Sequence, residues 1–290
     1  MIVNCTHDWE LHCHSQYSDG SMGLKALFEL AQSNGVSHLA LTDHDTAAGY
    51  RAALDEAQVP EGFTLYPATE LSCVWNKRTL HVVGLGIDAY SSEWLAVEQA
   101  YNHRREKRFQ RIVYLLQRAG LKIDEQTIRE YAKPGPPARP HIAKHLVETG
   151  QAKNLGSVYK RWLGQGQIGD VKSQWPEMAE AIDAINRCGG IAVIAHPHRY
   201  KLTWTKAREL IADFTAAGGK GIEVACIGIH PEFSKFLVEQ AQQNDLYVSG
   251  GSDFHHPDSA WLKLGKYPMW PNHAATVKDW LLRKYAAVGR

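Results

Sequence analysis

The sequence has no closely spaced cysteine pair, no long apolar run and almost no net charge. Its five cysteines are scattered along the chain, and none of them forms a CxxC pair. This pattern argues against a disulfide framework and is typical of a reducing compartment, so we expect a cytoplasmic protein. No apolar stretch approaches the roughly 18 residues that a membrane span requires. The first residues lack a basic region followed by an apolar run, so we also expect no signal peptide.

The balance of charges limits the partners that the protein can attract. The formal net charge is +1 over 290 residues, and 22% of the residues are charged. Such a chain has no general attraction for nucleic acid or for an anionic membrane, so an anionic substrate needs a local patch of positive charge. The length is sufficient for one large barrel or for one domain with an insertion.

Short apolar segments alternate with longer helical patterns over most of the chain. The expected strands are Trp9–Leu11, His38–Leu41, Thr64–Pro67, Leu80–Leu85, Ile191–Ile194, Ile222–Ala225 and Leu246–Val248. The expected helices between them are Leu24–Asn34, Ala48–Gln58, Pro176–Cys188, Lys206–Ala217 and Pro231–Asn244. Repeated strand–helix units predict an α/β fold with a parallel sheet, which can close into a barrel.

One stretch interrupts this alternation with helix after helix. Its expected helices are Glu93–Ala119, Asp124–Ala132, Arg139–Thr149 and Leu155–Leu163. We therefore expect a first barrel part over residues 1–91, a helical insertion over 92–166 that serves as a substrate-binding subdomain, and a second barrel part over 167–290.

Histidine is unusually frequent, with 15 residues in the chain. It is the commonest metal ligand among the side chains. His12 and His14 lie two apart in an expected strand, so they point to the same side, while Cys13 points to the opposite side. Two imidazoles at a strand end form half of a metal site, although a lone pair of this kind is more often an ordinary buried or surface pair.

Further histidines and carboxylates follow the other expected strands. They are Asp19, Asp43, His44, Asp45, Glu70, His81, His196, Asp253 and His255. Each one alone is explained by a turn, a helix cap or a polar surface loop. Together they place a ligand-type side chain at the same end of most strands, as a site at the C-terminal face of a barrel requires. Nitrogen and oxygen ligands of this kind suit Mn, Fe or Zn, with Mg possible.

These motifs resemble those of the polymerase-and-histidinol-phosphatase (PHP) family. The resemblance covers nearly the whole chain in order and is carried by His12-Cys13-His14, Ser18-Asp19-Gly20, Thr42-Asp43-His44-Asp45, Glu70, His81, Ala195-His196-Pro197 and Ser252-Asp253-Phe254-His255. Within the family, the chain is most similar to the branch of nucleoside 3′,5′-bisphosphate phosphatases and 5′-to-3′ exoribonucleases, which has a helical insertion at this place. The resemblance implies a distorted (β/α)7 barrel, similar to a TIM barrel, and two or three divalent cations, with Mn²⁺ the first expectation.

The resemblance also implies how the ligands are shared. The first metal would be held by His12, His14, Glu70 and Asp253, the second by Glu70, His81 and His196, and the third by Asp19, His44 and His255. The family usually has aspartate at the position of Glu10, and we expect Glu10 to support a ligand histidine. Asp43 and Asp45 are expected to orient neighbouring groups, with a helix cap as the competing interpretation.

Metal-activated hydroxide would attack the phosphorus, so no serine or cysteine nucleophile is needed. The residues expected to act in catalysis are His44, Asp253 and His255. His44 or a metal-bound water could protonate the leaving group.

Substrate phosphates that do not react need further cations. Arg105 and Arg108 lie three apart in the insertion and share a helix face, although a solvated helix surface would give the same pattern. The residues that the resemblance singles out for substrate binding are Arg105, Arg108, Arg139, His141, Gln174, Trp175 and Arg199. Trp175 could stack on a base or belong to the core. Relatives tend to have glycine at the position of His198, so a bulky imidazole there could narrow the site or add a contact to phosphate.

The sequence therefore predicts a metal-dependent phosphoesterase. Its expected substrates are nucleoside 3′,5′-bisphosphates such as adenosine 3′,5′-bisphosphate, or the 5′ ends of short RNA. The alternatives are a phosphatase of the histidinol-phosphate type, an amidohydrolase-type metal enzyme and a non-catalytic metal-binding module. We expect no membrane partner. A monomer is compatible with the sequence, which does not fix the oligomeric state.

Overall fold

The computed structural model describes residues 4–56, 58–171, 175–259, 261–272 and 274–287. Its centre is a seven-stranded sheet with the strand order β2-β3-β4-β5-β6-β7-β8. The strands are β2 (Trp9–Cys13), β3 (His38–Leu41), β4 (Thr64–Trp75), β5 (Arg78–Leu85), β6 (Ile191–Ile194), β7 (Gly221–Cys226) and β8 (Tyr247–Gly251). All seven strands that the sequence predicts are present, and the expected distorted barrel is confirmed.

The sheet is parallel except around β5. Strand β5 is antiparallel to both β4 and β6, whereas the pairs on either side of this region are parallel. The two outer strands approach each other through a parallel bridge between Cys13 and Phe254. There the Asp253 N–H donates to the His12 carbonyl at 2.8 Å, and the His14 N–H donates to the Phe254 carbonyl at 2.9 Å. The ends of β2 and β8 are therefore fixed to each other next to three of the expected ligands.

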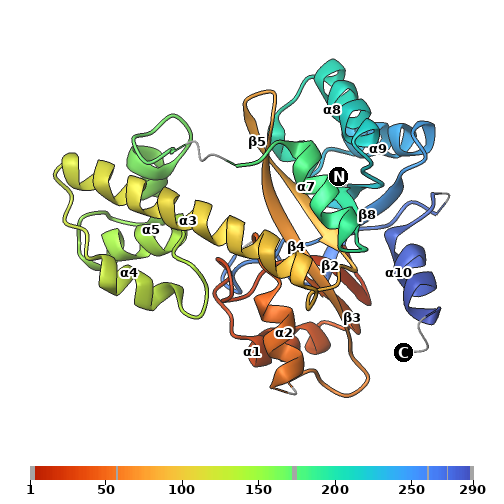
Figure 1. The fold of residues 1–290 in the computed structure, drawn as a ribbon, viewed down its shortest axis with the longest axis horizontal. Coiled ribbons are helices and arrows are strands. Elements are labelled where there is room, and N and C mark those ends of the chain that lie inside the picture. Colours follow the sequence, from red (N-terminus) through yellow and green to blue (C-terminus); the bar gives the residue numbers. More distant parts are fainter. Residues whose placement is uncertain (1–3, 57, 172–174, 260, 273, 288–290) are drawn as a thin grey trace.

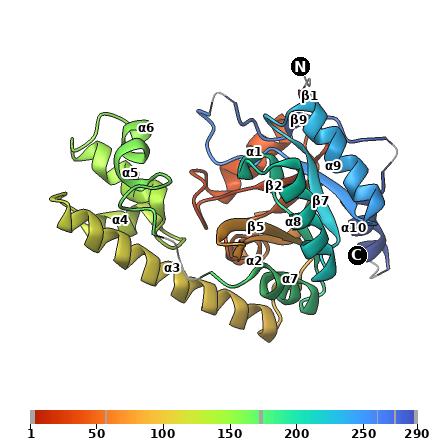
Figure 2. The ribbon, with the colours of Figure 1, turned by 90° about the horizontal axis from the view of Figure 1, so that it is seen from above.

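Helices cover the outside of the barrel, as Figures 1 and 2 show. They are α1 (Leu24–Ser33), α2 (Ala48–Asp55), α7 (Met178–Arg187), α8 (Trp204–Ala216), α9 (Pro231–Gln243) and α10 (Val277–Ala286). In α7 the buried side chains include Met178, Ala181, Ile182 and Ile185, the spacing of one apolar helix face. These side chains pack on the largest apolar core, which fills the space between the strands and the outer helices.

The helices of the expected insertion lie to one side of the barrel in both views, and the long helix α3 joins them to it (Figures 1 and 2). They are α3 (Ser92–Arg118), α4 (Glu125–Ala132), α5 (Arg139–Glu148) and α6 (Leu155–Val158), followed by the π-helix η1 (Tyr159–Leu163). Their buried apolar side chains form a separate core that includes Phe109, Leu116, Ile128, Ile142 and Leu146. The Ser91 hydroxyl caps α3 by accepting from the Trp94 N–H at 3.1 Å.

Some elements were not expected from the sequence. Strand β1 (Asn4–Thr6) pairs antiparallel with β9 (Lys266–Pro268), a contact between the two ends of the chain. Helix α10 and the short 3-10 helix η2 (Pro197–Tyr200) are also additional. Strand β4 continues eight residues past the expected Pro67, because it forms a hairpin with β5. Within the described residues, every helix is too short or too polar to cross a bilayer.

Candidate metal centre

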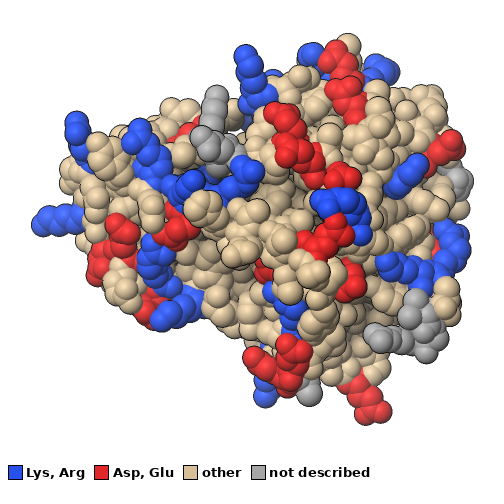
Figure 3. Space-filling view, in the orientation of Figure 1, with Lys and Arg blue, Asp and Glu red and all other residues tan. Residues whose placement is uncertain are grey.

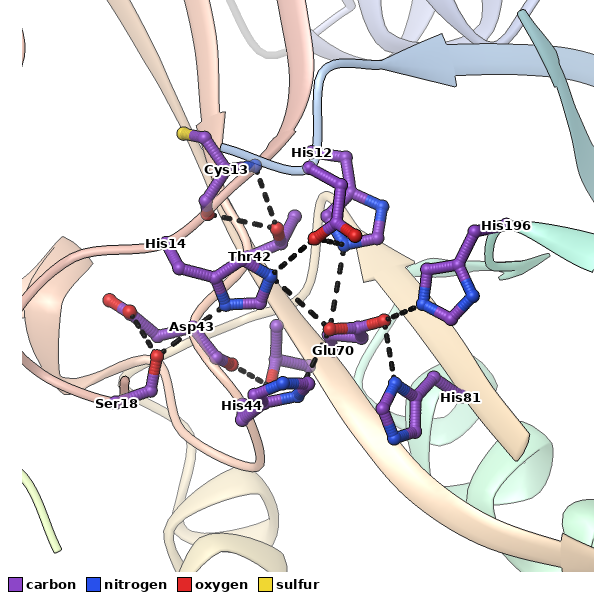
Figure 4. A network of polar contacts seen from close by, with 12 residues as sticks. His12, Cys13, His14, Ser18, Thr42, Asp43, His44, Glu70, His81 and His196 are labelled. Carbon is purple, nitrogen blue, oxygen red and sulfur yellow. Dashed lines mark hydrogen bonds and ion pairs between the residues drawn. The ribbon is translucent and has the colours of Figure 1, made fainter. Parts of the chain in front are cut away.

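Imidazoles and carboxylates from six strands and their following loops meet in one cluster. Figure 4 shows the part of this cluster around Glu70. His12 lies in β2 and His14 directly follows it. Glu70 lies in the middle of β4, and His81 lies on the neighbouring β5, where it pairs with Ser72. His196 follows β6, and Asp253 follows β8. The nine predicted metal-ligating residues all lie in this cluster or at its edge.

The most buried group consists of His12, His14, Glu70 and Asp253. The His12 Nε2 atom lies 3.4 Å from Glu70 Oε2 and 3.3 Å from Asp253 Oδ1. The His14 Nε2 atom lies 3.3 Å and 3.2 Å from the same two oxygens. Four ligand atoms therefore converge from three strands onto one small volume.

The chemistry of this group fits a divalent cation. Among the described residues, these same four atoms are buried without a hydrogen-bond partner, a costly arrangement in a protein interior. Ligand atoms held about 2.1 Å from a tetrahedral metal lie about 3.4 Å from one another, close to the separations seen here. A shared cation would satisfy all four atoms at once.

Glu70 connects this group to a second one. Its Oε1 atom lies 3.0 Å from His81 Nδ1 and 2.8 Å from His196 Nε2. Its Oε2 atom faces His12 and His14, and it lies 3.0 Å from His44 Nδ1. One carboxylate thus presents its two oxygens to two sets of imidazoles, as a ligand shared between two metals would.

A third group lies at the open edge of the cluster. Asp19 Oδ1 is 3.3 Å from His255 Nε2, 3.8 Å from His44 Nε2 and 3.9 Å from His14 Nδ1. These four residues are a further set that could hold a cation. The structure therefore brings together each of the three ligand sets that the sequence predicts.

Electrostatics favours the ionised form of the central carboxyl groups. Burial alone would raise the pKa of Glu70, but the imidazoles of His81, His44 and His12 hold that pKa well below its usual range. Burial likewise opposes ionisation of Asp253, and the neighbouring His12 and His255 lower its pKa well below normal. Both side chains can therefore carry negative charge in the protein interior, as metal ligands must.

The backbone is unusual at this site. His196 and Asp253 have positive φ angles of 29° and 51°, which residues other than glycine rarely adopt. Such conformations cost on the order of 1–3 kcal/mol each and persist where the surroundings enforce them. At Gly251 a Cβ atom would lie 2.6 Å from the His12 Cβ, so only glycine allows β8 to approach His12 this closely.

Glu223 is a buried residue of the site that the sequence analysis did not identify. Its Oε1 atom accepts from His12 Nδ1 at 2.7 Å, and its Oε2 atom accepts from the His196 backbone N–H at 2.5 Å. An accepting carboxylate at Nδ1 places the proton there and leaves the Nε2 lone pair for a metal. The signal available in the sequence was a glutamate in the middle of an otherwise apolar strand.

Glu10 supports a ligand histidine as expected, but it does so through the backbone and not through the imidazole. The Glu10 carboxylate accepts from the backbone N–H groups of His12, Ser252 and Gly265 at 3.1, 2.9 and 2.8 Å. It thus supports the backbone of His12, while Glu223 supports the imidazole. Glu10 and His12 lie two apart on β2 and point to the same face, but the Nδ1 atom of His12 is already bonded to Glu223 of β7.

Asp43 and Asp45 orient different partners. The Asp43 carboxylate accepts from the Ser15 and Ser18 hydroxyls at 2.7 and 2.6 Å, which fixes the loop after β2. Asp45 accepts from the Ser72 N–H at 2.6 Å and from Arg105 of α3 at 2.7 Å. Asp43 thus stabilises the turn that carries Asp19, whereas Asp45 connects the barrel to the insertion.

A cavity of about 110 Å³ adjoins the metal cluster on the side of the insertion. It is lined by His44 and His81 from the cluster and by Arg105, Arg108 and Arg139 from the insertion. Burial, together with the nearby Arg139 and Arg105, lowers the pKa of Arg108 to about 10. Three guanidinium groups that repel one another form a site for an anion. Figure 3 shows a band of Lys and Arg side chains where the insertion meets the barrel.

The other predicted substrate-binding residues have different positions. Trp175 lines the cavity, where its ring stacks with Tyr101 at 6.0 Å and lies 5.6 Å from the Arg105 guanidinium. His141 does not belong to the cavity lining, and its Nδ1 accepts from the Ala138 N–H at 3.0 Å at the start of α5. Gln174 lies outside the described residues. The Arg199 guanidinium contacts the Asp253 carboxylate, and Arg199 does not belong to the lining of this cavity.

Known proteins are similar in sequence to this chain over nearly its whole length. The family model described as the PHP domain matches residues 10–225. A 5′-3′ exoribonuclease of Haemophilus influenzae is 40% identical over 264 residues, covering 90% of this chain and 94% of that protein. A 3′,5′-nucleoside bisphosphate phosphatase of Chromobacterium violaceum is 36% identical over 259 residues, covering 88% of this chain and 90% of that protein.

A solved structure has the same fold. It is a Chromobacterium violaceum protein described as an amidohydrolase with bound sulfate and no metal. It superposes with a TM-score of 0.85 at 33% sequence identity and covers 95% of this chain and 96% of its own. The barrel and the helices beside it are therefore common to both proteins.

Proposed function

Because this chain belongs to the PHP domain family and is a metal-dependent hydrolase of phosphate esters, we propose that its substrate is a nucleotide with a 5′-phosphate and a phosphate ester on its 3′ oxygen. A nucleoside 3′,5′-bisphosphate and the 5′ end of a short RNA both meet this description. The observation that carries the proposal is the pocket of three arginines beside the ligand cluster. This pocket can hold one phosphate while a second one lies at the metals.

The proposed metal ligands are the nine residues that the sequence singles out. His12, His14, Glu70 and Asp253 would hold one cation, Glu70, His81 and His196 a second, and Asp19, His44 and His255 a third. We propose Mn²⁺ as the native ion, since the donor set mixes imidazole nitrogen with carboxylate oxygen. Bound divalent cations supply an activated water and neutralise charge on a phosphoryl group.

The remaining tasks belong to side chains of the chain itself. Arg105, Arg108 and Arg139 bind and orient the 5′-phosphate. The helices of residues 92–166, which supply all three arginines, thus act as a substrate-binding subdomain. His44 lines the same cavity, so its imidazole is placed either to bind metal or to give a proton to the leaving oxygen. A cytoplasmic location stays a prediction from the cysteine pattern.

The same bond breaks in both candidate substrates. Removing the 3′-phosphate of a bisphosphate breaks the bond between phosphorus and the 3′ oxygen, and releasing a 5′-nucleotide from RNA breaks this same bond. In each case the oxygen of water is added to phosphorus, and the 3′ oxygen leaves with a proton. One arrangement of ligands and arginines therefore serves phosphatase and exoribonuclease activity alike.

The test is a product-release screen with the purified protein. Adenosine 3′,5′-bisphosphate, 5′-phosphorylated di- and trinucleotides, histidinol phosphate and simple 5′-mononucleotides would each be incubated with Mn²⁺, Mg²⁺ or Zn²⁺. We expect inorganic phosphate from the bisphosphate and 5′-mononucleotide from the short RNAs. Release from histidinol phosphate alone, or from neither nucleotide class with any of the metals, would overturn the proposed substrate.

A further inference from the structure

A second, larger hollow lies beside the metal cluster and is not used by the function proposed above. Its volume is about 570 Å³. It is lined by Lys77, Arg78 and Thr79 from the β4–β5 hairpin, by Gln165 after η1, and by Arg199 and Tyr200 after β6. We call this hollow the hairpin groove. It lies between the tip of the hairpin, the end of the insertion and the loop that carries His196.

Residues that line the hairpin groove contact the proposed metal ligands. Thr79 lines both the hairpin groove and the arginine cavity, so the two spaces adjoin along β5. At the other end, Tyr200 accepts from the His81 N–H through its hydroxyl at 2.9 Å. Arg199 contacts Asp253, a residue of the most buried ligand group. A ligand bound at the cluster could therefore extend into the groove, whose lining does not include the three arginines.

The sizes of the two spaces suit different parts of a substrate. The arginine cavity, at about 110 Å³, lies below the roughly 300–1,000 Å³ of ordinary ligand pockets, so it is suited to a phosphate group. The hairpin groove, at about 570 Å³, falls within that range and can accept a nucleoside. A bisphosphate has no group that would continue beyond its 3′-phosphate, whereas an RNA strand does.

The charges of the hairpin groove also suit a strand of nucleic acid. Lys77 and Arg78 are exposed at the hairpin tip, and Arg199 adds a third cation. Asp170, the acidic residue in the lining, uses its Oδ2 atom to accept from the Gly166 N–H at 2.9 Å. Cations along a groove bind phosphates without regard to base sequence, and such binding weakens as salt rises.

We propose that the hairpin groove binds the nucleotide on the 3′ side of the scissile phosphate, which makes a 5′-phosphorylated RNA of two or more nucleotides the full substrate of this protein. This inference rests on the proposed function and deepens it. In it, the first nucleotide lies between the arginines and the metals, and the second lies in the groove with its next phosphate near Lys77 and Arg78. A nucleoside 3′,5′-bisphosphate then occupies the site without contacting the groove.

The experiment uses the double substitution Lys77→Asn with Arg78→Gln in the full chain. Asparagine suits position 77 because Lys77 has a φ angle of 63°, which asparagine tolerates better than other residues with a side chain. The matched control is Lys235→Gln, which removes one exposed cation from α9, outside the groove lining. Kinetics would be measured with Mn²⁺ on the bisphosphate, a 5′-phosphorylated dinucleotide and a 5′-phosphorylated trinucleotide.

We expect the double variant to raise KM for the trinucleotide about 5- to 10-fold and to leave KM for the bisphosphate within about 2-fold of the unsubstituted protein. The control should change neither value. Equal effects on all three substrates, or no effect on any, would overturn the groove assignment while leaving the proposed function intact.

A binding measurement separates failure of the groove from failure of the proposed function. Fluorescence anisotropy with a labelled, 5′-phosphorylated trinucleotide in EDTA requires no turnover. If the unsubstituted protein hydrolyses neither substrate but binds the trinucleotide more tightly than the double variant does, the proposed function fails and the groove assignment stands. Equal binding by both proteins would reject the groove.

Discussion

At the scale of single residues, the site depends on which nitrogen of each imidazole carries the proton. The buried Glu223 carboxylate accepts from His12 Nδ1, so His12 Nε2 keeps its lone pair and points at Glu70 and Asp253. The same carboxylate holds the His196 backbone in its rare positive-φ conformation. Glu223 is thus a positioning residue that acts on two proposed ligands without being one.

Replacing Glu223 tests this role. Glu223→Gln keeps the shape of the side chain but removes its charge, so its amide can no longer enforce the Nδ1-protonated form of His12. We expect Mn²⁺ affinity to fall by about 10- to 100-fold, the usual effect of losing the partner of a ligand histidine. Calorimetric titration with Mn²⁺ would measure this affinity. The control is the single substitution Glu177→Gln in the otherwise unchanged chain, because Glu177 is exposed. Unchanged affinity would show that the Glu223 carboxylate does not orient His12.

Asp253 tests the ligand cluster directly. Asp253→Asn preserves the side-chain volume and suits the φ of 51°, but it removes the charge that faces His12 and His14. We expect kcat for phosphate release to fall by at least about 100-fold. The control is Asp258→Asn, whose side chain is 90% exposed. A variant with normal kcat would exclude Asp253 from the active site.

At the scale of elements, a buried ion pair connects the long helix α3 to the barrel. Asp45 lies on the loop after β3. Its Oδ2 atom accepts from both the Nε and the Nη2 atoms of Arg105 on α3, each at 2.7 Å. Asp45 is fully buried, and Arg105 is 8% exposed. The pair fixes one of the three arginines of the anion pocket, so helix docking and phosphate binding depend on the same contact.

Asp45→Asn should therefore change stability and binding together. The substitution leaves the buried guanidinium without a counter-charge, and we expect the free energy of unfolding to fall by about 2–3 kcal/mol. The comparison is Glu106→Gln, which weakens an ion pair with Arg129 whose two side chains are 35% and 34% exposed, and which should cost about 0–1 kcal/mol. Urea denaturation measures both, and KM for the bisphosphate should rise only in the Asp45 variant. Equal destabilisation of the two variants would contradict this account.

At the scale of the whole molecule, cation binding should stabilise the fold, since the proposed ligands come from β2, β4, β5 and the loops after β2, β3, β6 and β8. A ligand that binds only the folded state at 100 times its Kd adds about 2.7 kcal/mol of stability. We expect Tm to rise by several degrees as Mn²⁺ is added to EDTA-treated protein, and to rise less in Asp253→Asn. A Tm that is independent of Mn²⁺ would contradict binding to the folded barrel.

Much of the architecture follows from local pattern. Apolar segments such as His38–Leu41 and Ile191–Ile194 form strands with the bounds that the sequence predicts, because strand and helix periodicity are properties of neighbouring residues. The pairing of β1 with β9 was not predicted. It joins residues more than 250 positions apart, and three-residue strands carry almost no periodic signal.

The sequence by itself determined the barrel class and the kinds of side chain that end each strand. It could do so because buried strands are apolar and the polar residues that interrupt them are conspicuous. Only the tertiary structure decided which carboxylate serves which imidazole. Glu223 binds the His12 imidazole although the two residues lie 211 positions apart in the sequence. Glu10 accepts from backbone N–H groups, and Asp45 accepts from the Arg105 guanidinium. These choices depend on the direction of each side chain in the closed barrel, which no local pattern contains.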